Sequence, residues 1–413
     1  MTQSRAGRIG PLARCTCLRH SVPSALMTAT DTVRRTSDPA DILATVRSLT
    51  PAITARSEEI EHARRLPPDL VGQLREAGCF RMLVPRRAGG AEAELPDHYA
   101  MLRELARADG SVGWTVMIGS SAPVILGLLP TETFAAIYAD SPDIVLAGAF
   151  KPTGVATPVD HGFHVTGRWA FASGCQHTDW FIGHCMVDDG RSPPLRMMVL
   201  PPEDVEIVDT WTVSGLCGTG SHDFTVDGVF VPDERTFSIF EDGGLDGPVG
   251  RIPELVFSSL AIANVAVGIA EGALAEVATL ASAKVPMFAD ATLAANPLFR
   301  YSLGDVDAHL RAIRSLLDAD AVTAWSTALA GAEFTPRLRA QLRATATWST
   351  AAAARVVDAA YTAGGGSSLY ASSPLQRRLR DVHAITQHFA VKPDTLTLAG
   401  AVLAGQDVDL SFL

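Results

Sequence analysis

Apolar residues recur at helical spacing in the first third of the chain. Ile42 and Val46 fall on one face of a helix, and Leu70 and Leu74 fall on one face of another. The second helix should end at Gly78, because glycine readily adopts the left-handed backbone that closes a helix. We therefore predict an N-terminal helical domain over residues 38–146.

One stretch of this part is apolar enough to need a membrane test. Residues 111–130 carry no charged side chain and are long enough to span a bilayer. However, the stretch contains Gly119 and Pro123, and acidic residues, Asp109 and Glu132, flank it without any basic bias. We expect a buried helix over residues 112–129 of a soluble protein, with no membrane partner.

The pattern changes between residues 147 and 240. Short runs of β-branched, aromatic and large apolar residues, such as residues 163–166, 180–183, 197–200 and 224–226, are separated by Gly, Pro and Asp. This pattern predicts a central, β-barrel-like domain over residues 147–240.

The last part of the chain is rich in alanine and again helical. A Gly-rich linker at 241–253 precedes a long apolar helix at 255–283, and further helices are expected near 303–317, 336–363 and 374–391. These helices predict a C-terminal four-helix bundle over residues 250–413. Helices, then strands, then helices define an α+β protein and not an alternating βαβ fold.

Composition narrows the function. The chain has 413 residues and a net charge of −11, so a nucleic-acid partner has no general electrostatic support. Its six cysteines show no C-x-x-C spacing, which is typical of reduced thiols in a cytoplasmic protein. The first 26 residues contain four arginines and no acid. We expect a disordered basic leader over residues 1–37, with Met27 as a second candidate start.

Two turns could approach a ligand closely. Residues 169–175 end a predicted strand in Ser173 and Gly174, where small side chains allow a planar molecule to approach the backbone. Taken alone, these residues are more typical of a strand-end turn stabilised by serine. Residues 215–222 are rich in glycine, but they lack the lysine of a P-loop and precede a strand, so alone they indicate a bulged turn.

The histidines do not predict a metal site. His383 and His388 are five residues apart, which turns them by about 140° on a helix. His177 and Asp179 would share one side of a strand, whereas His184 would lie on the other. As a single residue, His388 is typical of a packed or capping histidine.

Four pieces in order carry a resemblance. They are residues 108–114, residues 169–175, the turn 215–221 running into residues 229–232, and the segment 380–388. Together they resemble the acyl-CoA dehydrogenase superfamily over about residues 38–405. More narrowly, they are similar to its oxygen-using branch, the reduced-flavin-dependent two-component monooxygenases, such as the 4-hydroxyphenylacetate, steroid-phenol and dibenzothiophene oxygenases. The dehydrogenases are expected to carry an acidic base just after the Arg-Asp pair, where this chain has His388 and no Glu before its end.

The resemblance implies a function and its partners. The chain would be the oxygenase component of a two-component flavoprotein monooxygenase. It would use reduced FMN and O2, through a flavin hydroperoxide, to hydroxylate or oxygenate a small aromatic or heteroatom-containing molecule. A separate NAD(P)H-flavin reductase would supply the flavin, since the chain shows no NADH-binding motif, and a homotetramer is expected. A serine and a histidine within apolar walls suit this chemistry, because the oxygenated flavin decays unless water is excluded and its proton is controlled.

The resemblance also implies site residues. His388, near the flavin carbon that takes up oxygen, and Ser173, near N5, are the expected catalytic residues. Arg300 and the glycines of the 364–367 turn would reach the flavin of a neighbouring subunit. The expected cofactor-binding residues are Phe171, Ser173, Gly174, Cys175, Thr219, Ser221, Arg300, Gly365 and Gly366, with no metal ligand.

One departure bears on the substrate. Phenol hydroxylases of this group tend to have a histidine in the helix after the Gly-Ser-x-x-Trp element, but residues 118–123 contain none. Phenols are therefore disfavoured, which leaves an amine, a sulfur centre, a polyketide-like aromatic molecule or another ring. The alternatives are an acyl-CoA dehydrogenase with FAD, a nitroso-forming amino-sugar oxidase, and a helical scaffold that has lost the flavin.

Overall fold

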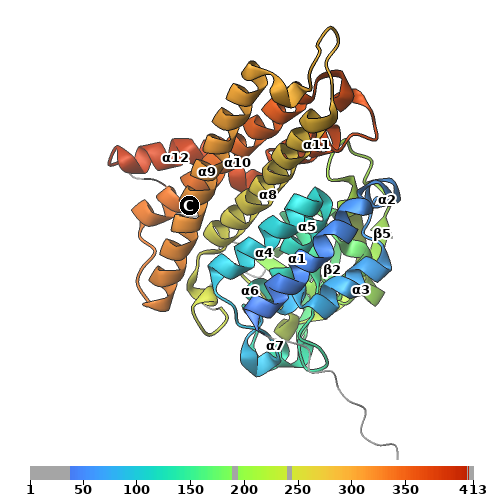
Figure 1. Ribbon diagram of the computed structural model, residues 1–413. Coiled ribbons are helices and arrows are strands. Elements are labelled where there is room, and N and C mark those ends of the chain that lie inside the picture. The colour runs from blue at the N-terminus through green and yellow to red at the C-terminus, as the bar shows by residue number, and fades with distance from the viewer. Residues whose placement is uncertain (1–37, 188–193, 240–243, 407, 409–413) are drawn as a thin grey trace, which may run out of the picture. The chain divides into compact units, whose positions relative to one another are not determined.

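A computed structural model describes residues 38–187, 194–239, 244–406 and 408. The predicted leader lies outside these residues. The described chain begins with helices and turns to strands only at Leu146, as predicted (Figure 1). The α3 helix ends at Gly78, whose φ of 91° confirms the expected C-terminal glycine. The N-terminal helices are α1 (Pro39–Ala55), α2 (Ser57–Ala63), α3 (Pro68–Ala77), α4 (Leu95–Ala108), α5 (Gly110–Ser120), α6 (Ala122–Leu126) and α7 (Thr131–Ile137).

The uncharged stretch at 111–130 is buried as expected, but the prediction of one continuous helix was wrong. Asp109 caps α5 by accepting from the backbone N–H groups of Ser111 and Val112, and α5 ends at Ser121. Pro123 lies in the first turn of α6, where its missing N–H does not interrupt a helical hydrogen bond. The stretch therefore forms two short helices.

The strands form a single sheet with the order β5-β6-β2-β1-β3-β4-β7, in which β1 and β3 are parallel and the other pairs antiparallel. Its inner face encloses its own apolar core, in which the Trp169 ring stacks on that of Phe224 at 4.9 Å. Strands β4 and β6 contact each other although three strands separate them in the sheet. The sheet is therefore strongly curled, in the manner expected of a barrel-like unit. The strands are β1 (Leu146–Val159), β2 (Gly162–Ala172), β3 (Trp180–Val187), β4 (Leu195–Leu200), β5 (Glu206–Val208), β6 (His222–Pro232) and β7 (Thr236–Phe237).

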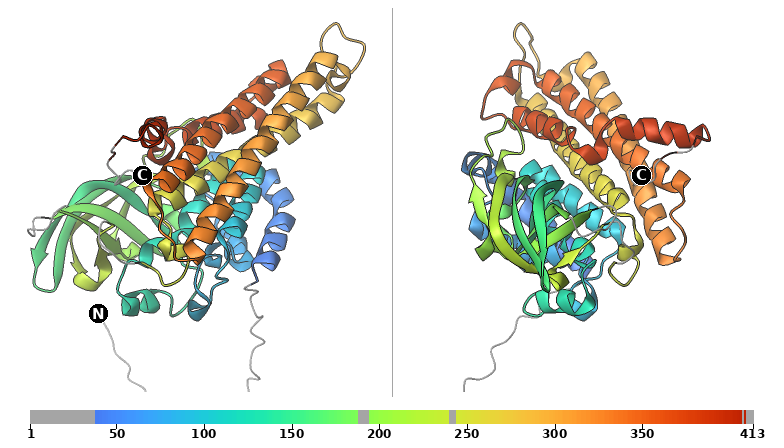
Figure 2. Two further views of the ribbon diagram at one scale, coloured as in Figure 1. Left: turned by 90° about the vertical axis from the view of Figure 1, so that its left-hand side faces the viewer. Right: turned by 180° about the vertical axis from the view of Figure 1, so that it is seen from behind.

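Helix α8 is the centre of the molecule. It packs against α4 and α5 on one side and against α9, α10 and α11 on the other (Figures 1 and 2). Among the described helices, α8 alone has the length and apolar composition needed to cross a membrane, but 83% of its most apolar window is buried inside the protein. It is therefore a core helix. The C-terminal helices are α8 (Glu254–Ala283), α9 (Pro297–Leu329), α10 (Pro336–Gly364), α11 (Pro374–Ile385) and α12 (Asp394–Leu403).

Two further sequence predictions need correction. The helix expected over 374–391 ends at Ile385, and a single 3₁₀ turn, η10 (Phe389–Val391), follows it. His388 therefore lies outside a helix, as the N-cap of η10, which agrees with the capping role that it has as a single residue. His177 belongs to the 3₁₀ turn η3 (Cys175–His177) and not to a strand, so the argument that placed it beside Asp179 was wrong.

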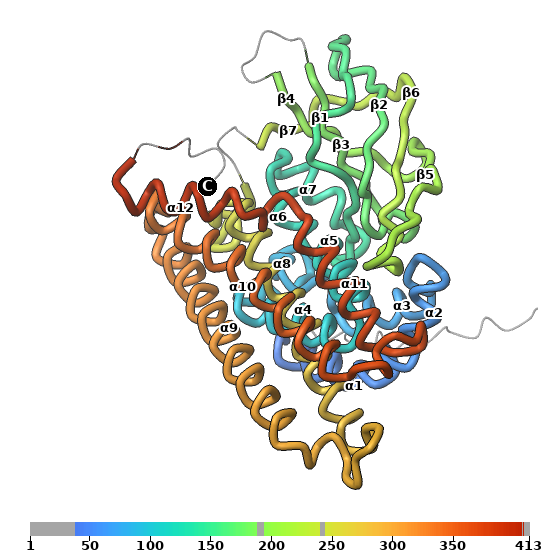
Figure 3. Tube along the Cα trace, turned by 90° about the horizontal axis from the view of Figure 1, so that it is seen from above, coloured from blue at the N-terminus to red at the C-terminus, as the bar shows by residue number. Residues whose placement is uncertain are grey.

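Helix α11 connects the bundle to the sheet. It lies beside α5, α8 and α10 (Figure 3). The Asp381 carboxylate of α11 accepts from the Leu216 N–H at 2.6 Å, and the same side chain packs on Gly110, where a Cβ would lie 3.0 Å from its Oδ2. The Gly-rich turn after β5 is therefore fixed against the start of α5. The division into three domains stays a prediction.

Candidate active site

Three hydroxyl groups meet where the two predicted turns come together. Ser173, which follows β2, shares a hydrogen bond of 2.7 Å with the Ser221 hydroxyl. The Ser221 hydroxyl is also 2.7 Å from that of Thr219, which donates to the Leu216 carbonyl at 2.8 Å. The structure thus brings Ser173, Thr219 and Ser221 into one chain of buried hydroxyls.

Trp114 of α5 connects this chain to His388. Its indole N–H donates to the Ser173 hydroxyl at 3.0 Å, and its ring meets the His388 ring edge-on, with 5.5 Å between centroids. Elements far apart in sequence therefore converge on one indole: α5, the end of β2 and the turn η10. Trp114 thus bridges the two residues predicted to be catalytic. It lies in the segment 108–114 that carries part of the resemblance, but it was not among the predicted site residues.

The state of His388 follows from its contacts. Its Nδ1 accepts from the Ala390 N–H at 3.3 Å. Burial lowers the pKa of His388 to about 4, so the imidazole is neutral near pH 7. A neutral ring that accepts at Nδ1 carries its proton on Nε2. His388 is therefore a hydrogen-bond donor at Nε2.

Two aromatic side chains lie beside the hydroxyls, and one of them is exposed. The Phe171 side chain is 70% exposed although its φ of 69° is unusual for a bulky residue. Its ring lies edge-on to Trp211 at 6.1 Å, and the Trp211 N–H donates to the Leu216 carbonyl at 3.1 Å. An exposed aromatic ring at a strained backbone position is typical of a ligand site.

Cys175 lies between the two turns that carry the hydroxyls. Its thiol donates to the Gly220 carbonyl at 3.3 Å, and burial raises the pKa of the thiol to about 12. The thiol therefore stays protonated and joins the two turns. It does not supply a nucleophile.

Thr115 is a candidate site residue that the sequence does not single out. Its hydroxyl is buried and has no hydrogen-bond partner among the described residues. Its methyl group lies 3.2 Å from the point where a Cβ on Gly174 would stand, and Gly174 itself has a φ of 75°. A glycine at this place and an unpaired hydroxyl beside it suit a planar, polar-edged molecule such as a flavin ring. No periodicity or motif distinguishes Thr115 from its buried neighbours on α5.

Arg300, Gly365 and Gly366 do not join this site within one chain. The Lys284 ammonium donates to the Gly364 carbonyl at 2.6 Å, and the Arg300 guanidinium donates to the Ala294 carbonyl at 2.7 Å, so the three residues lie at the end of the bundle where α8 and α10 stop. Arg343, which contacts η10, is about 30 Å away from Gly365 along α10 at 1.5 Å per residue.

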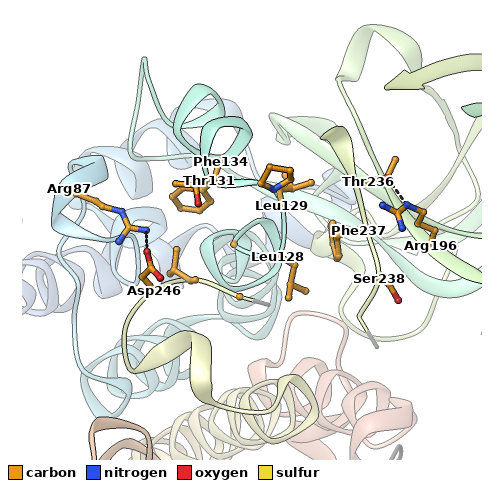
Figure 4. A pocket seen from close by; sticks show the side chains of 14 residues that line it. Arg87, Leu128, Leu129, Thr131, Phe134, Arg196, Thr236, Phe237, Ser238 and Asp246 are labelled. Atoms are coloured by element: carbon orange, nitrogen blue, oxygen red, sulfur yellow. Dashed lines mark hydrogen bonds and ion pairs between the residues drawn. The ribbon is translucent and has the colours of Figure 1, made fainter. Parts of the chain in front are cut away.

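Two hollows of the described surface lie elsewhere. One, of about 390 Å³, runs from α7 to β7 and contains the Arg87–Asp246 ion pair and the Arg196–Thr236 hydrogen bond (Figure 4). The other, of about 360 Å³, lies beside Arg65 and His177. Neither includes Ser173, Ser221 or His388. Within the described ranges no cluster of three histidine, cysteine or acidic side chains could hold a metal ion.

Comparison with known proteins identifies the family. The acyl-CoA dehydrogenase N-terminal domain matches residues 36–130, and the acyl-CoA dehydrogenase C-terminal domain matches residues 260–393. Indole-3-acetate monooxygenase of Pseudomonas putida is 35% identical over 353 residues, which cover 85% of this chain and 90% of that protein. The oxygenase subunit HsaA of a flavin-dependent monooxygenase from Rhodococcus jostii is 30% identical, covering 84% of this chain and 94% of the relative.

Solved structures agree with this result. The HsaA monooxygenase of M. tuberculosis superposes with a TM-score of 0.85 at 28% identity, covering 91% of this chain and 100% of that one. Dibenzothiophene monooxygenase TdsC of Paenibacillus, solved with FMN and indole, superposes with a TM-score of 0.78 at 20% identity, over 90% of this chain and 99% of TdsC, and shows the shared fold.

The chain belongs to the acyl-CoA dehydrogenase superfamily. Within it, the chain is the oxygenase component of a two-component, reduced-flavin-dependent monooxygenase that acts on a small aromatic or heteroatom-containing substrate, and it therefore has a flavin reductase as its partner. The predicted fold, family and enzyme class are confirmed, and the dehydrogenase and scaffold alternatives are excluded.

Proposed function

We propose that the site built by Trp114, Ser173, Ser221 and His388 binds the reduced flavin ring. The observation that carries this proposal is the continuous contact from the His388 ring through the Trp114 indole to the Ser173 and Ser221 hydroxyls. Phe171 and the backbone of Gly174 and Cys175 would line the ring, and Thr219 would lie toward the phosphate side. Each of these side chains or backbone groups can pack on, or hydrogen-bond to, a flat heterocycle.

His388 would then control a proton in a dry place. When bound, the reduced flavin supplies the two electrons that activate O2. The neutral His388 imidazole would offer its Nε2–H as a proton donor, and the Trp114 ring packs against it. Overall, one oxygen atom enters a C–H bond of the substrate, the other leaves as water, and the flavin is released oxidised.

We infer an indole-like nitrogen heteroaromatic substrate. The relative with indole-3-acetate in its name is 35% identical over most of the chain. The segment 118–123 has no histidine, and the imidazole that contacts it, His98, is fully buried against Ser120 and Phe257. Burial lowers the pKa of His98 to about 3, and the side chain has no solvent-exposed surface. It cannot serve as the base that activates a phenol, whereas an electron-rich indole reacts without one.

We propose FMN as the flavin, with FAD as the alternative. The hydroxyls of Ser173, Ser221 and Thr219 lie within two turns of one chain, which would hold the flavin ring and its nearest phosphate. The name of a 30% identical relative, an FADH(2)-dependent resorcinol hydroxylase, supports the alternative. Anaerobic titration with FMNH2 and with FADH2 decides between them by their dissociation constants.

We also propose a homotetramer in the cytoplasm. The end of the bundle exposes large apolar side chains, among them Met287 at 82%, Phe288 at 100% and Tyr301 at 73%. Such a surface is expected to be covered by another subunit. Arg300, Gly365 and Gly366 lie at this same end and would reach the flavin of the neighbouring subunit.

The substrate proposal is tested with a reductase, NADH and ¹⁸O2. We expect one ¹⁸O atom in the product from indole or indole-3-acetate and none in products from resorcinol. Labelled product from resorcinol without any from the indoles would overturn the substrate class and leave the enzyme class unchanged.

A further inference from the structure

We propose that Arg343 is a positioning residue for His388, acting through the backbone of Ala390. The inference rests on the proposed role of His388 in the active site. It assigns to a buried cation of the bundle the task of setting the orientation and tautomer of that imidazole.

The segment that carries His388 cannot hold its own shape. Turn η10 is a single 3₁₀ turn of three residues, closed by the Val391 N–H donating to the His388 carbonyl at 3.1 Å. One turn fixes several backbone dihedrals for very few hydrogen bonds, so it needs support from its surroundings. The Ala390 N–H that donates to His388 Nδ1 belongs to this same turn. The ring is therefore only as well oriented as the turn.

Arg343 supplies that support. Its side chain, on the first part of α10, is only 3% exposed. One guanidinium nitrogen, Nη2, donates to the Ala390 carbonyl at 3.2 Å and to the Thr395 hydroxyl of α12 at 3.3 Å. Ala390 is completely buried, so its carbonyl needs a partner within the protein. Arg343 therefore holds the carbonyl of Ala390, the same residue whose N–H donates to the His388 ring.

The charge of Arg343 has a counterpart. Burial lowers the pKa of the Arg343 guanidinium, and the carboxylate of Glu254, at the start of α8, opposes that shift. Burial raises the pKa of Glu254 to about 7, and Arg343 acts in the opposite direction. Burying a cation costs desolvation free energy unless partners within the protein offset it. The Arg343 guanidinium has such partners on α8, α12 and η10, and it therefore connects these elements to α10.

The first test uses the flavin-free full chain with ¹⁵N-labelled histidine. The His388 ring signals are assigned by their loss in His388→Gln. In the wild type we expect an unprotonated Nδ1, a protonated Nε2 and no titration between pH 5 and 8. In Arg343→Gln we expect the two tautomers to average and the titration midpoint to rise into this range.

Arg81→Gln is the matched control. Arg81 is 2% exposed and pairs with the buried Asp143 at 2.9 Å, so its loss also breaks a buried ion pair. Its guanidinium also donates to the Arg75 carbonyl of α3, and neither of these partners belongs to η10. We expect its His388 signals to match the wild type. If Arg343→Gln does not fold, Arg343→Lys is the second variant. It keeps the positive charge but loses the guanidinium group, so we expect the same changes in the His388 signals. Wild-type His388 signals in a folded Arg343 variant would overturn the proposal.

The second test separates this proposal from the proposed function. With reductase, NADH and substrate, Arg343→Gln should release more of the consumed O2 as hydrogen peroxide, by about tenfold, the effect expected for the loss of an orienting contact. If His388→Ala leaves peroxide release unchanged while the ring signals still move in Arg343→Gln, the role of His388 fails and the positioning by Arg343 stands. If the ring signals do not move, the positioning fails whatever the activity.

Discussion

At the residue scale, the site depends on which polar atoms are already paired. The Ser173 hydroxyl accepts from Trp114 and shares a hydrogen bond with Ser221, so it is held in one orientation before any ligand arrives. The Thr115 hydroxyl, by contrast, has no partner in the described part of the chain and is available to a bound molecule. Ser173 therefore fixes the shape of the site, whereas Thr115 offers an unpaired hydroxyl to a ligand.

Ser173→Ala should weaken reduced-flavin binding and lower stability. The change removes one hydrogen bond to the ring, about 1.5 kcal/mol or roughly tenfold in Kd, and leaves the Trp114 N–H without its acceptor. Anaerobic fluorescence titration with reduced flavin measures the first effect, and thermal unfolding the second. Ser173→Thr, which keeps the hydroxyl, serves as the control. Equal flavin affinity in all three proteins would contradict the assignment.

His98 makes the stability of the helical core depend on pH. Its pKa is about 3 when buried and about 6.5 in an unfolded chain, so between these values only the unfolded chain binds the proton. The stability that the neutral, buried ring contributes is complete above pH 6.5 and is lost as the pH falls. Urea unfolding should therefore show the advantage of the wild type over His98→Leu shrinking by about 1.4 kcal/mol per pH unit between about pH 6 and 4. A pH-independent difference would refute this.

At the scale of elements, most helices and strands followed from the sequence and the joints between them did not. Apolar periodicity located α8 and α10 to within a residue, and Gly78 marked the end of α3. The break at Ser121 and the end of α11 at Ile385 were missed, because the apolar pattern continues through both. The meeting of Trp114 with Ser173 and His388 could not be predicted from spacing, since it depends on how α5, β2 and η10 pack.

Asp381, the acidic residue of the Arg-Asp pair, holds the turn after β5 against α11. Asp381 accepts from the Leu216 N–H, and burial together with the charge of Asp109 raises its pKa to about 7. Asp381→Ala should release the turn η5 (Cys217–Thr219), lower the free energy of unfolding by about 1–3 kcal/mol and weaken flavin binding. Asp381→Asn keeps an acceptor and should show much smaller effects in the same urea and flavin titrations. Similar losses in both variants would show that the contact with Leu216 is not the cause.

At the scale of the whole molecule, the proposed flavin site needs residues from a second subunit. Phe288→Asp combined with Tyr301→Asp should disrupt the assembly, because it places two charges on the exposed apolar end of the bundle. Light scattering should show smaller particles, and the affinity for reduced flavin should fall, because in the proposed arrangement Arg300, Gly365 and Gly366 would no longer reach the flavin. Val155→Asp, a substitution of a 58% exposed residue on β1, is the control. A wild-type monomer, or an unchanged assembly of the double variant, would contradict this arrangement.

The central claim is that His388, beside Trp114 and Ser173, stabilises the oxygen-reactive state of this enzyme. The most direct measurement mixes the anaerobic protein, loaded with FMNH2, with oxygenated buffer in a stopped-flow spectrometer. We predict a long-lived species that absorbs differently from both reduced and oxidised flavin. Its decay should be at least tenfold faster in His388→Ala, because a positioned proton donor contributes roughly 10²–10⁴-fold to a reaction rate. Direct return to oxidised flavin at the rate of free FMNH2, or equal lifetimes in the two proteins, would contradict it.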